Sequence, residues 1–140
     1  MNFYLDTSVI VNFLTPEPLS SRADAFVGAH LDELVVSDFA AAEFSSVIAR
    51  RVRTEELRPN EAHTVLTDFD AWLGRAVLRI EIASGDIKQA DAYLRRLDLP
   101  LRAPDAIHIA IAWRRGVSLV TFDRQLAAAA RTLGIAVAEA

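Results

Sequence analysis

The chain contains no cysteine, one methionine and a single lysine, Lys88, among its 140 residues. Without cysteine it can form neither a disulfide nor a thiolate metal site, and a cytoplasmic location is the expectation. No apolar run approaches the roughly 18 residues that a transmembrane helix requires, and no basic segment precedes the first apolar stretch as in a secretory signal. We therefore expect no membrane association and no zinc site built on sulfur ligands.

Positive charge comes almost entirely from arginine. Lys88 is the one lysine among 15 basic residues, and 19 acidic residues bring the net charge to −4. The planar guanidinium group of arginine matches phosphate in a bidentate way, which favours a nucleic-acid ligand despite the negative total. An arginine-rich chain can equally reflect the base composition of a genome, so composition alone leaves both explanations open.

Apolar runs alternate with helical patterns along the whole chain, and 52% of the residues are hydrophobic. We expect strands at residues 3–5, 34–37, 78–82, 117–120 and 135–137, and helices at 9–14, 20–30, 38–52, 61–75, 84–97, 104–115 and 125–133. Strands separated by helices form right-handed crossovers and a parallel sheet that is covered on both faces. The sequence therefore predicts a single domain over residues 1–140, a three-layer α/β/α fold with a central parallel sheet of about five strands.

Particular residues are expected to start and stop these helices. Ser20 or Ser21, Asp38 and Asn60 are the expected N-caps, because their short polar side chains accept hydrogen bonds from the first turn. Gly116 is expected to end the helix that begins near Pro104.

Four acidic residues fall near the expected ends of these elements: Asp6 after the first strand, Glu43 in the helix after the second, Asp105 behind Pro104, and Asp123 after the fourth strand. The carboxyl ends of parallel strands share one edge of a sheet, and ligands bind there in open α/β folds. We therefore expect the four carboxylates to approach one another. Removing them takes the net charge from −4 to 0, so the acidic surplus has the size of the expected site.

Clustered carboxylates raise one another's pKa, and a divalent cation relieves their repulsion. Oxygen ligands suit Mg²⁺ or Mn²⁺, which supply a nucleophilic water and stabilise charge on a phosphate. Each acid also has a simpler explanation. Asp6 and Asp123 can be helix caps, Asp105 can complement a helix dipole, and Glu43 can lie on the surface.

Three hydroxyl residues and two arginines lie beside these acids. Thr7, Ser8 and Thr121 can orient carboxylates or hold metal-bound water, and local capping bonds are an equal alternative for each. Arg102 and Arg124 can contact a substrate phosphate or remain solvated on the surface.

The aromatic residues and histidines give weaker signals. His108 follows Asp105 by three residues, on the same helical face and among apolar neighbours, which favours a satisfied core histidine over a general base. Trp72 and Trp113 fit helical apolar spacing, and we expect them in the core or in an interface.

The chain resembles the PIN-domain ribonucleases, and more narrowly the VapC-type toxins of prokaryotic toxin–antitoxin pairs, in four segments: YLDTSVI at 4–10, AAEF at 41–44, RAPDAIH at 102–108 and TFDR at 121–124. The resemblance covers nearly the entire chain. It implies a Mg²⁺- or Mn²⁺-dependent endoribonuclease that leaves a 5′-phosphate. It also implies that Asp6, Glu43, Asp105 and Asp123 form the acidic quartet, with Thr121 as the accompanying hydroxyl. RNA as substrate, a homodimer and a VapB-type antitoxin that blocks the site are implied as well.

Two other classes of protein stay open on the residues alone. A haloacid-dehalogenase-like phosphatase usually has a second Asp two positions after the first, where this chain has Ser8, and a receiver domain uses a lysine near the last strands, whereas Lys88 falls earlier. A catalytically silent binding module is the third possibility. In such a module the four carboxylates would repel one another with no bound cation to offset the repulsion.

Overall fold

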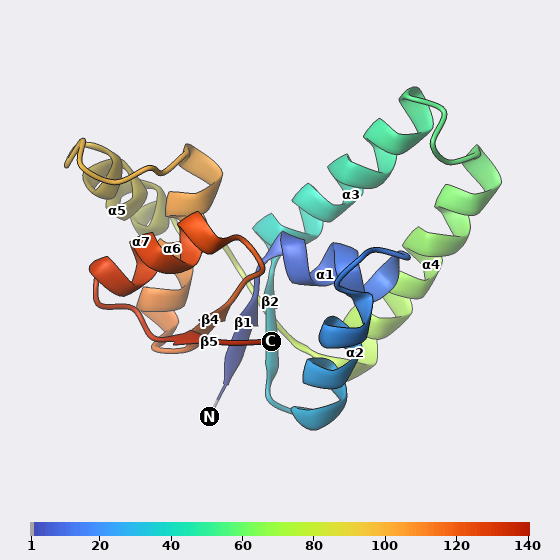
Figure 1. The fold of residues 1–140 in the computed structure, drawn as a ribbon, viewed down its shortest axis with the longest axis horizontal. Helices are drawn as coiled ribbons and strands as arrows, with labels where there is room; N and C mark the ends of the chain where they lie inside the picture. The colour runs from blue at the N-terminus through green and yellow to red at the C-terminus, as the bar shows by residue number, and fades with distance from the viewer. Residues whose placement is uncertain (1) are drawn as a thin grey trace.

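A computed structural model describes residues 2–140 as alternating strands and helices (Figure 1). The elements are β1 (Phe3–Leu5), α1 (Thr7–Leu14), α2 (Ser20–Ala29), β2 (Leu34–Ser37), α3 (Asp38–Arg53), α4 (Pro59–Ala76), β3 (Leu78–Ile80), α5 (Ser84–Leu94), α6 (Ala103–Arg115), β4 (Ser118–Val120), α7 (Arg124–Thr132) and β5 (Val137–Ala138). The five strands pair in parallel in the order β3-β2-β1-β4-β5. The predicted α/β/α fold with a five-stranded parallel sheet is confirmed.

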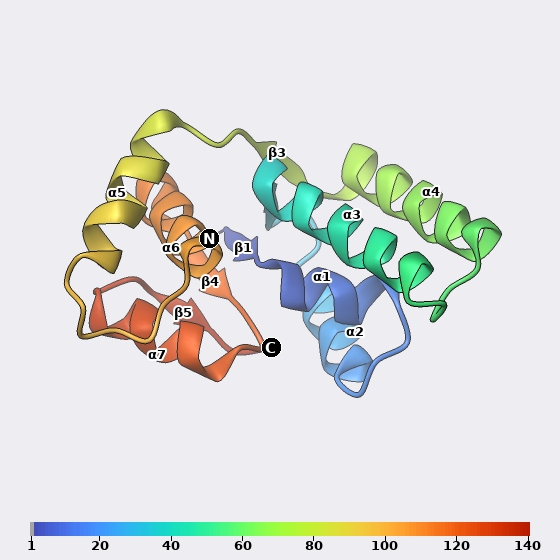
Figure 2. The same ribbon diagram turned by 90° about the horizontal axis from the view of Figure 1, so that it is seen from above.

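Alternation along β1 shows how the three layers arise. Phe3 and Leu5 pack in one apolar cluster with residues of α1, α2, α3 and α4, whereas Tyr4 packs in a second cluster with residues of α5, α6 and α7. Successive side chains of a strand point to opposite faces, so each face of the central strand anchors one helical layer. Figures 1 and 2 show the two helical groups on either side of the sheet. Within residues 2–140, no helix has the length and apolarity needed to span a bilayer.

The carboxyl edge of the sheet gathers the first turns of three helices. α1 begins two residues after β1 ends, α3 follows β2 directly, and α7 begins four residues after β4 ends. The amide of Asp6 donates to the carbonyl oxygen of Val120 over 3.1 Å, which ties the end of β1 to the end of β4. The connections after β1, β2 and β4 therefore open onto one edge.

The cap of α3 differs from the prediction. Ser37, rather than Asp38, is the N-cap, and its Oγ accepts from the amide of Ala40 over 2.9 Å. Asp38 then lies in the first turn, where its carboxylate complements the helix dipole and accepts from Arg79 Nε over 2.9 Å. The last residue of β2 thus also starts α3, and no loop separates them.

Other boundaries differ for equally local reasons. α4 begins at Pro59, which suits the first helical position, so Asn60 is inside the helix rather than its cap. Ser20 is the first residue of α2, not its cap, and Ser21 also lies within the helix. Gly116 ends α6 in the left-handed conformation with φ of 64°, as predicted.

The end of α5 and the position of the last strand differ by a few residues from the predicted bounds. α5 ends at Leu94, and Leu97 has a φ of 65°, which no right-handed helix continues. β5 occupies Val137–Ala138, where it pairs with β4.

Candidate active site

Asp6 lies buried at the carboxyl end of β1 and caps α1, with 4% of its surface exposed. Its Oδ1 accepts from Ser8 Oγ over 2.6 Å and from the amide of Val9 over 3.2 Å, and its Oδ2 accepts from Thr121 Oγ1 over 2.5 Å. Burial raises the pKa of Asp6, and the nearby His108 and these hydrogen bonds offset the rise only in part. Asp6 is thus a helix cap, as its position in the sequence allows, and it is also a buried carboxylate.

Glu43 projects from α3 toward two donors on other elements. Thr7 Oγ1 donates to Glu43 Oε1 over 2.6 Å, and His108 Nε2 lies 2.5 Å from the same oxygen. Burial would raise the pKa of Glu43, but the hydrogen bonds from His108 and Thr7, together with the positive charge of His108 whenever its imidazole is protonated, outweigh it, so the pKa is lowered. Glu43 is half-buried and held at one oxygen, rather than lying free on the surface.

Asp105 and Asp123 are each held by amides at a helix start. Asp105 Oδ2 accepts from the amide of Arg102 over 3.3 Å in the first turn of α6. Asp123 is the N-cap of α7, and its Oδ1 accepts from the amides of Gln125 and Leu126 over 2.9 and 3.1 Å. Both acids thus lie at a helix start, as their positions in the sequence predict. Backbone amides fix each of them through a single oxygen.

Asp105 and Asp123 line one pocket of about 500 Å³ together with Arg102. Burial raises the pKa of Asp105, against the amide of Arg102, and the negative charges of Asp123 and Glu43 raise it further. The negative charges of two other predicted acids, Glu43 and Asp123, therefore reach Asp105 through space. Asp6 is connected to Asp123 by hydrogen bonds through Thr121.

Thr121 links two of the acids directly. Its Oγ1 donates to Asp6 Oδ2 and accepts from the amide of Asp123 over 3.0 Å. Ser8 Oγ donates to Asp6 and accepts from the amide of Phe122 over 3.0 Å, so it joins the start of α1 to the segment after β4. The three hydroxyl residues singled out from the sequence all contact a carboxylate of the quartet, since Thr7 contacts Glu43.

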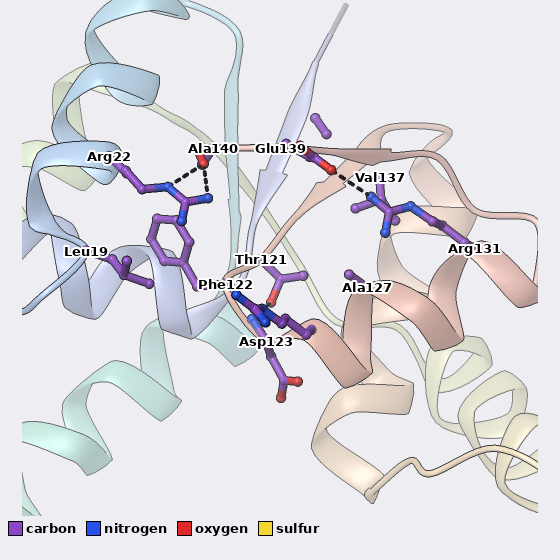
Figure 3. A pocket seen from close by; sticks show the side chains of 12 residues that line it. Leu19, Arg22, Thr121, Phe122, Asp123, Ala127, Arg131, Val137, Glu139 and Ala140 are labelled. Atoms are coloured by element: carbon purple, nitrogen blue, oxygen red, sulfur yellow. Dashed lines mark hydrogen bonds and ion pairs between the residues drawn. The ribbon is translucent and has the colours of Figure 1, made fainter.

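A second pocket, of about 470 Å³, also has Asp123 in its lining and is shown in Figure 3. Arg124 lines it with Arg22 and Arg131. Arg22 donates to the carbonyl oxygen of Ala140 through Nε and Nη2, over 2.9 and 2.5 Å. The two arginines predicted to meet phosphate thus flank Asp123, with Arg102 in one pocket and Arg124 in the other.

The arrangement of the carboxylates bears directly on metal binding. Within residues 2–140, no three His, Asp or Glu side chains lie close enough to enclose an ion. Glu43, Asp105 and Asp123 each accept through one oxygen, and no donor among the described residues reaches the other. These free oxygens belong to hard ligands, and that donor type fits Mg²⁺ or Mn²⁺.

His108 is the contact that sequence reasoning missed. It is buried, with 3% of its surface exposed, as expected for a core histidine, yet its Nε2 contacts Glu43 of another helix. The spacing from Asp105 was visible in the sequence, whereas the approach of α6 to α3 is a tertiary feature. Trp72 is buried as predicted, and Trp113 is 59% exposed on α6.

A profile of the PIN domain matches residues 3–132. The chain belongs to the PIN-domain family. It is 31% identical over 127 residues to Ribonuclease VapC3 of Pyrobaculum aerophilum, and the match covers 91% of this chain and 93% of that relative. The resemblance seen in four short segments of this PIN-domain protein therefore extends along the sequence, and it favours a nuclease over the phosphatase and receiver alternatives.

Solved structures share the fold of this PIN-domain protein. VapC20 of Mycobacterium tuberculosis, a sarcin–ricin loop cleaving toxin, has a TM-score of 0.75 at 18% identity and covers 91% of this chain and 95% of its own. DNA-bound VapBC of Salmonella typhimurium has a TM-score of 0.75 at 16% identity, and the match covers 99% of this chain and 98% of that one. At these identities the likeness establishes the fold alone.

Proposed function

We propose that this PIN-domain protein is a VapC-type endoribonuclease, the toxin of a type II toxin–antitoxin pair, which hydrolyses phosphodiester bonds of RNA. The observation that carries the proposal is the 31% identity to Ribonuclease VapC3 over 91% of the chain. The carboxylates at the carboxyl edge of the sheet support it, since this edge is where open α/β folds bind ligands. The whole chain, residues 1–140, acts as one PIN domain in this proposal.

We assign the catalytic and metal-binding roles to Asp6, Glu43, Asp105 and Asp123. These carboxylates would hold a Mg²⁺ or Mn²⁺ ion, which would supply a nucleophilic water and stabilise negative charge on the phosphate. The chain's own contribution is orientation. Amides and hydroxyls hold one oxygen each of Glu43, Asp105 and Asp123 and leave the other for a ligand.

Supporting and substrate-binding roles fall to residues around these acids. Thr7, Ser8 and Thr121 fix the carboxylates through the hydrogen bonds described above. The exposed guanidinium groups of Arg102 and Arg124 hold RNA phosphates on either side of Asp123, because arginine pairs with phosphate in a bidentate way. Hydrolysis adds water at phosphorus and breaks the bond from phosphorus to the 3′ oxygen, so the products are a 5′-phosphate end and a 3′-hydroxyl end.

The partners follow from the same assignment. A VapB-type antitoxin silences the enzyme by placing an arginine or lysine among the carboxylates, where it replaces the cation. The exposed Trp113 on α6 and Ile87 on α5, two helices packed side by side in Figure 2, offer apolar surface to a second copy in a homodimer. RNA as substrate places the protein in the cytoplasm.

Sequencing of RNA ends tests the activity. Cells that express the parent chain are expected to accumulate new 5′-phosphate ends at a few sites, whereas cells that express Asp105→Asn are not. The asparagine can still accept from the amide of Arg102, so the start of α6 is preserved while a charged ligand is lost. Equal ends from both chains would refute the role of Asp105, and no new ends from either would refute the ribonuclease.

Metal addition should stabilise the parent protein. Mn²⁺ at 100 times its Kd adds about 2.7 kcal/mol to the free energy of unfolding, because the ion binds the folded state. For a chain of this length the melting temperature rises by roughly 8 °C. Differential scanning calorimetry with and without millimolar Mn²⁺ measures the shift, and Asp105→Asn should show a smaller one. An identical melting temperature with and without the ion would contradict a metal site.

A further inference from the structure

We propose that His108 is a positioning residue for Glu43, fixed in its working orientation by a buried hydrogen-bond chain through Tyr4 and Ser37. The inference rests on the proposed function, because it concerns how one carboxylate of that site is presented. It adds residues that lie outside the acidic quartet and its hydroxyls. It also gives a role to a buried histidine that the sequence assigned only to the core.

The hydrogen-bond chain joins residues of four elements, β2, β1, α6 and α3, without a break. Ser37 Oγ lies 2.7 Å from the hydroxyl of Tyr4, which lies 2.6 Å from His108 Nδ1. His108 Nε2 in turn lies 2.5 Å from Glu43 Oε1. Ser37 and Tyr4 have no exposed surface, so the path from the end of β2 through β1 to α6 is shielded from water until it reaches Glu43.

The hydrogens along this path fit a single direction. The amide of Ala40 donates to Ser37 Oγ, and Ser37 is free to donate its own proton to the oxygen of Tyr4. Tyr4 keeps its own proton, because burial raises the pKa of its hydroxyl, and it donates to His108 Nδ1. With Nδ1 as acceptor, the neutral imidazole carries its hydrogen on Nε2 and donates it to Glu43.

The acceptor at the end of the path requires the same direction. Oε1 of Glu43 already accepts from Thr7 Oγ1, and a carboxylate oxygen has no hydrogen to give to Nε2. An imidazole with its hydrogen on Nδ1 would set a lone pair against that carboxylate. Tyr4 therefore selects the tautomer that Glu43 needs.

Aromatic contacts fix the plane of the imidazole as well. The centroid of the Phe39 ring lies 5.1 Å from that of His108, and the centroid of the Tyr4 ring lies 5.7 Å from it. Phe39 is on α3, one turn before Glu43, so the helix that carries the carboxylate also packs against its donor. The imidazole has little freedom to turn away from Oε1.

The contact has a functional consequence for the other oxygen of Glu43. Thr7 and His108 converge on Oε1 from α1 and α6, and among residues 2–140 no donor reaches Oε2. Two donors from different elements fix both the position and the rotation of a carboxylate. His108 is also one turn beyond Asp105, so it holds Glu43 at a set place relative to a second acid of the quartet.

Substitution of His108 tests the proposal by two readouts. His108→Leu removes the donor, and we expect kcat for RNA cleavage and the affinity for Mn²⁺ to fall by about 10- to 100-fold, the usual cost of losing a partner of a metal ligand. KM for RNA should stay near the parent value, since His108 does not reach the substrate. His108→Gln keeps an N–H that can point to Oε1 and should recover most of both losses.

Tyr4→Phe tests the hydrogen bond that the Tyr4 hydroxyl makes to His108. It removes only the hydroxyl that donates to Nδ1, so kcat and Mn²⁺ affinity should fall less than in His108→Leu while KM is unchanged. Arg114→Ala serves as a control for general destabilisation, because Arg114 lies at the far end of α6 and contacts none of these residues. At a temperature where all variants are folded, Arg114→Ala should keep the parent Mn²⁺ affinity.

The intact protein provides a measurement that needs no variant. Long-range ¹H–¹⁵N spectra of the metal-free parent should show His108 with its hydrogen on Nε2 and an unprotonated Nδ1. A hydrogen on Nδ1 alone, or a His108→Leu protein with parent kcat and parent Mn²⁺ affinity, would overturn the proposal. A parent that binds Mn²⁺ but cuts no RNA would instead count against the proposed function, while the spectra and the calorimetric affinities still decide the role of His108.

Discussion

Asp6→Asn is expected to lower RNA cleavage by at least about a thousandfold, because a metal ligand at the reacting phosphate contributes several kcal/mol of transition-state stabilisation. The fold should survive the change. The asparagine Oδ1 can accept from Ser8 and from the amide of Val9 as Asp6 does now, and its Nδ2 can donate to Thr121 Oγ1. Single-turnover cleavage of a short RNA measures the rate, and thermal unfolding in metal-free buffer measures the stability.

The same variant should be at least as stable as the parent at neutral pH. Burial raises the pKa of Asp6 above its ordinary value of 3.8, so ionised Asp6 costs the folded state free energy at pH 7. The cost exists above the pKa of the unfolded chain and disappears as the pH falls, because Asp6 is then protonated in both states. The advantage of Asp6→Asn in melting temperature should therefore shrink from pH 7 toward pH 4.

A matched control separates the site from the surface. Asp91 is exposed on α5 and accepts from Arg95 over 2.9 Å, a pair that contributes little. Asp91→Asn should change neither cleavage nor stability appreciably. An Asp6→Asn protein that cuts RNA at the parent rate would show that Asp6 is a structural cap and nothing more.

Arg114→Ala should destabilise the protein more than any other surface-facing change we consider. The carboxylate of Asp86 is 1% exposed, and Arg114 donates to both of its oxygens, from Nε over 2.7 Å and from Nη2 over 3.0 Å. Removing the arginine leaves a buried charge whose remaining donor among residues 2–140 is the amide of Ala83. Breaking a buried pair on one side costs about 3–5 kcal/mol. The melting temperature should fall by roughly 10–15 °C in a chain of this length.

Arg115→Ala is the natural comparison, since Arg115 is the next residue of α6 and is exposed. Its loss should change the free energy of unfolding by about 0.5 kcal/mol or less. Cleavage by folded Arg114→Ala at low temperature should match the parent, because Arg114 joins α6 to the loop before α5, where it also donates to the carbonyl oxygen of Glu81. Equal melting temperatures for the two variants would mean that the Asp86 pair does not stabilise the fold.

Much of the fold could be predicted because local signals and long-range packing agree. Phe3–Leu5 is a short apolar run followed by a capping Asp, and the structure has both a strand and a cap there. The spatial order of the strands was not predictable, because β1 and β4 are neighbours although they are more than a hundred residues apart in sequence. Where several polar residues compete for one helix start, as Ser37 and Asp38 do, pattern alone does not choose between them.

The candidate site likewise has parts that the sequence predicts and parts that depend on tertiary packing. Asp6, Asp105 and Asp123 stand at element ends that the sequence reveals, so their approach to one edge could be expected from a parallel sheet. The partner of Glu43 could not be predicted from the sequence, because His108 reaches Glu43 only through the packing of α6 against β1 and α3. A buried histidine amid isoleucine and alanine has the same pattern whether or not its second nitrogen meets a carboxylate.

The hydrogen bond from Thr121 to Asp6 joins residues that are 115 positions apart. A ribosome making this protein therefore synthesises almost all of it before the two groups can meet. Every unfinished polypeptide that stops short of Thr121 lacks both the hydroxyl of that residue and the last acid, Asp123. With Asp6 and Asp123 in the roles that we propose, such a polypeptide could not cleave the RNA of the ribosome that is making it.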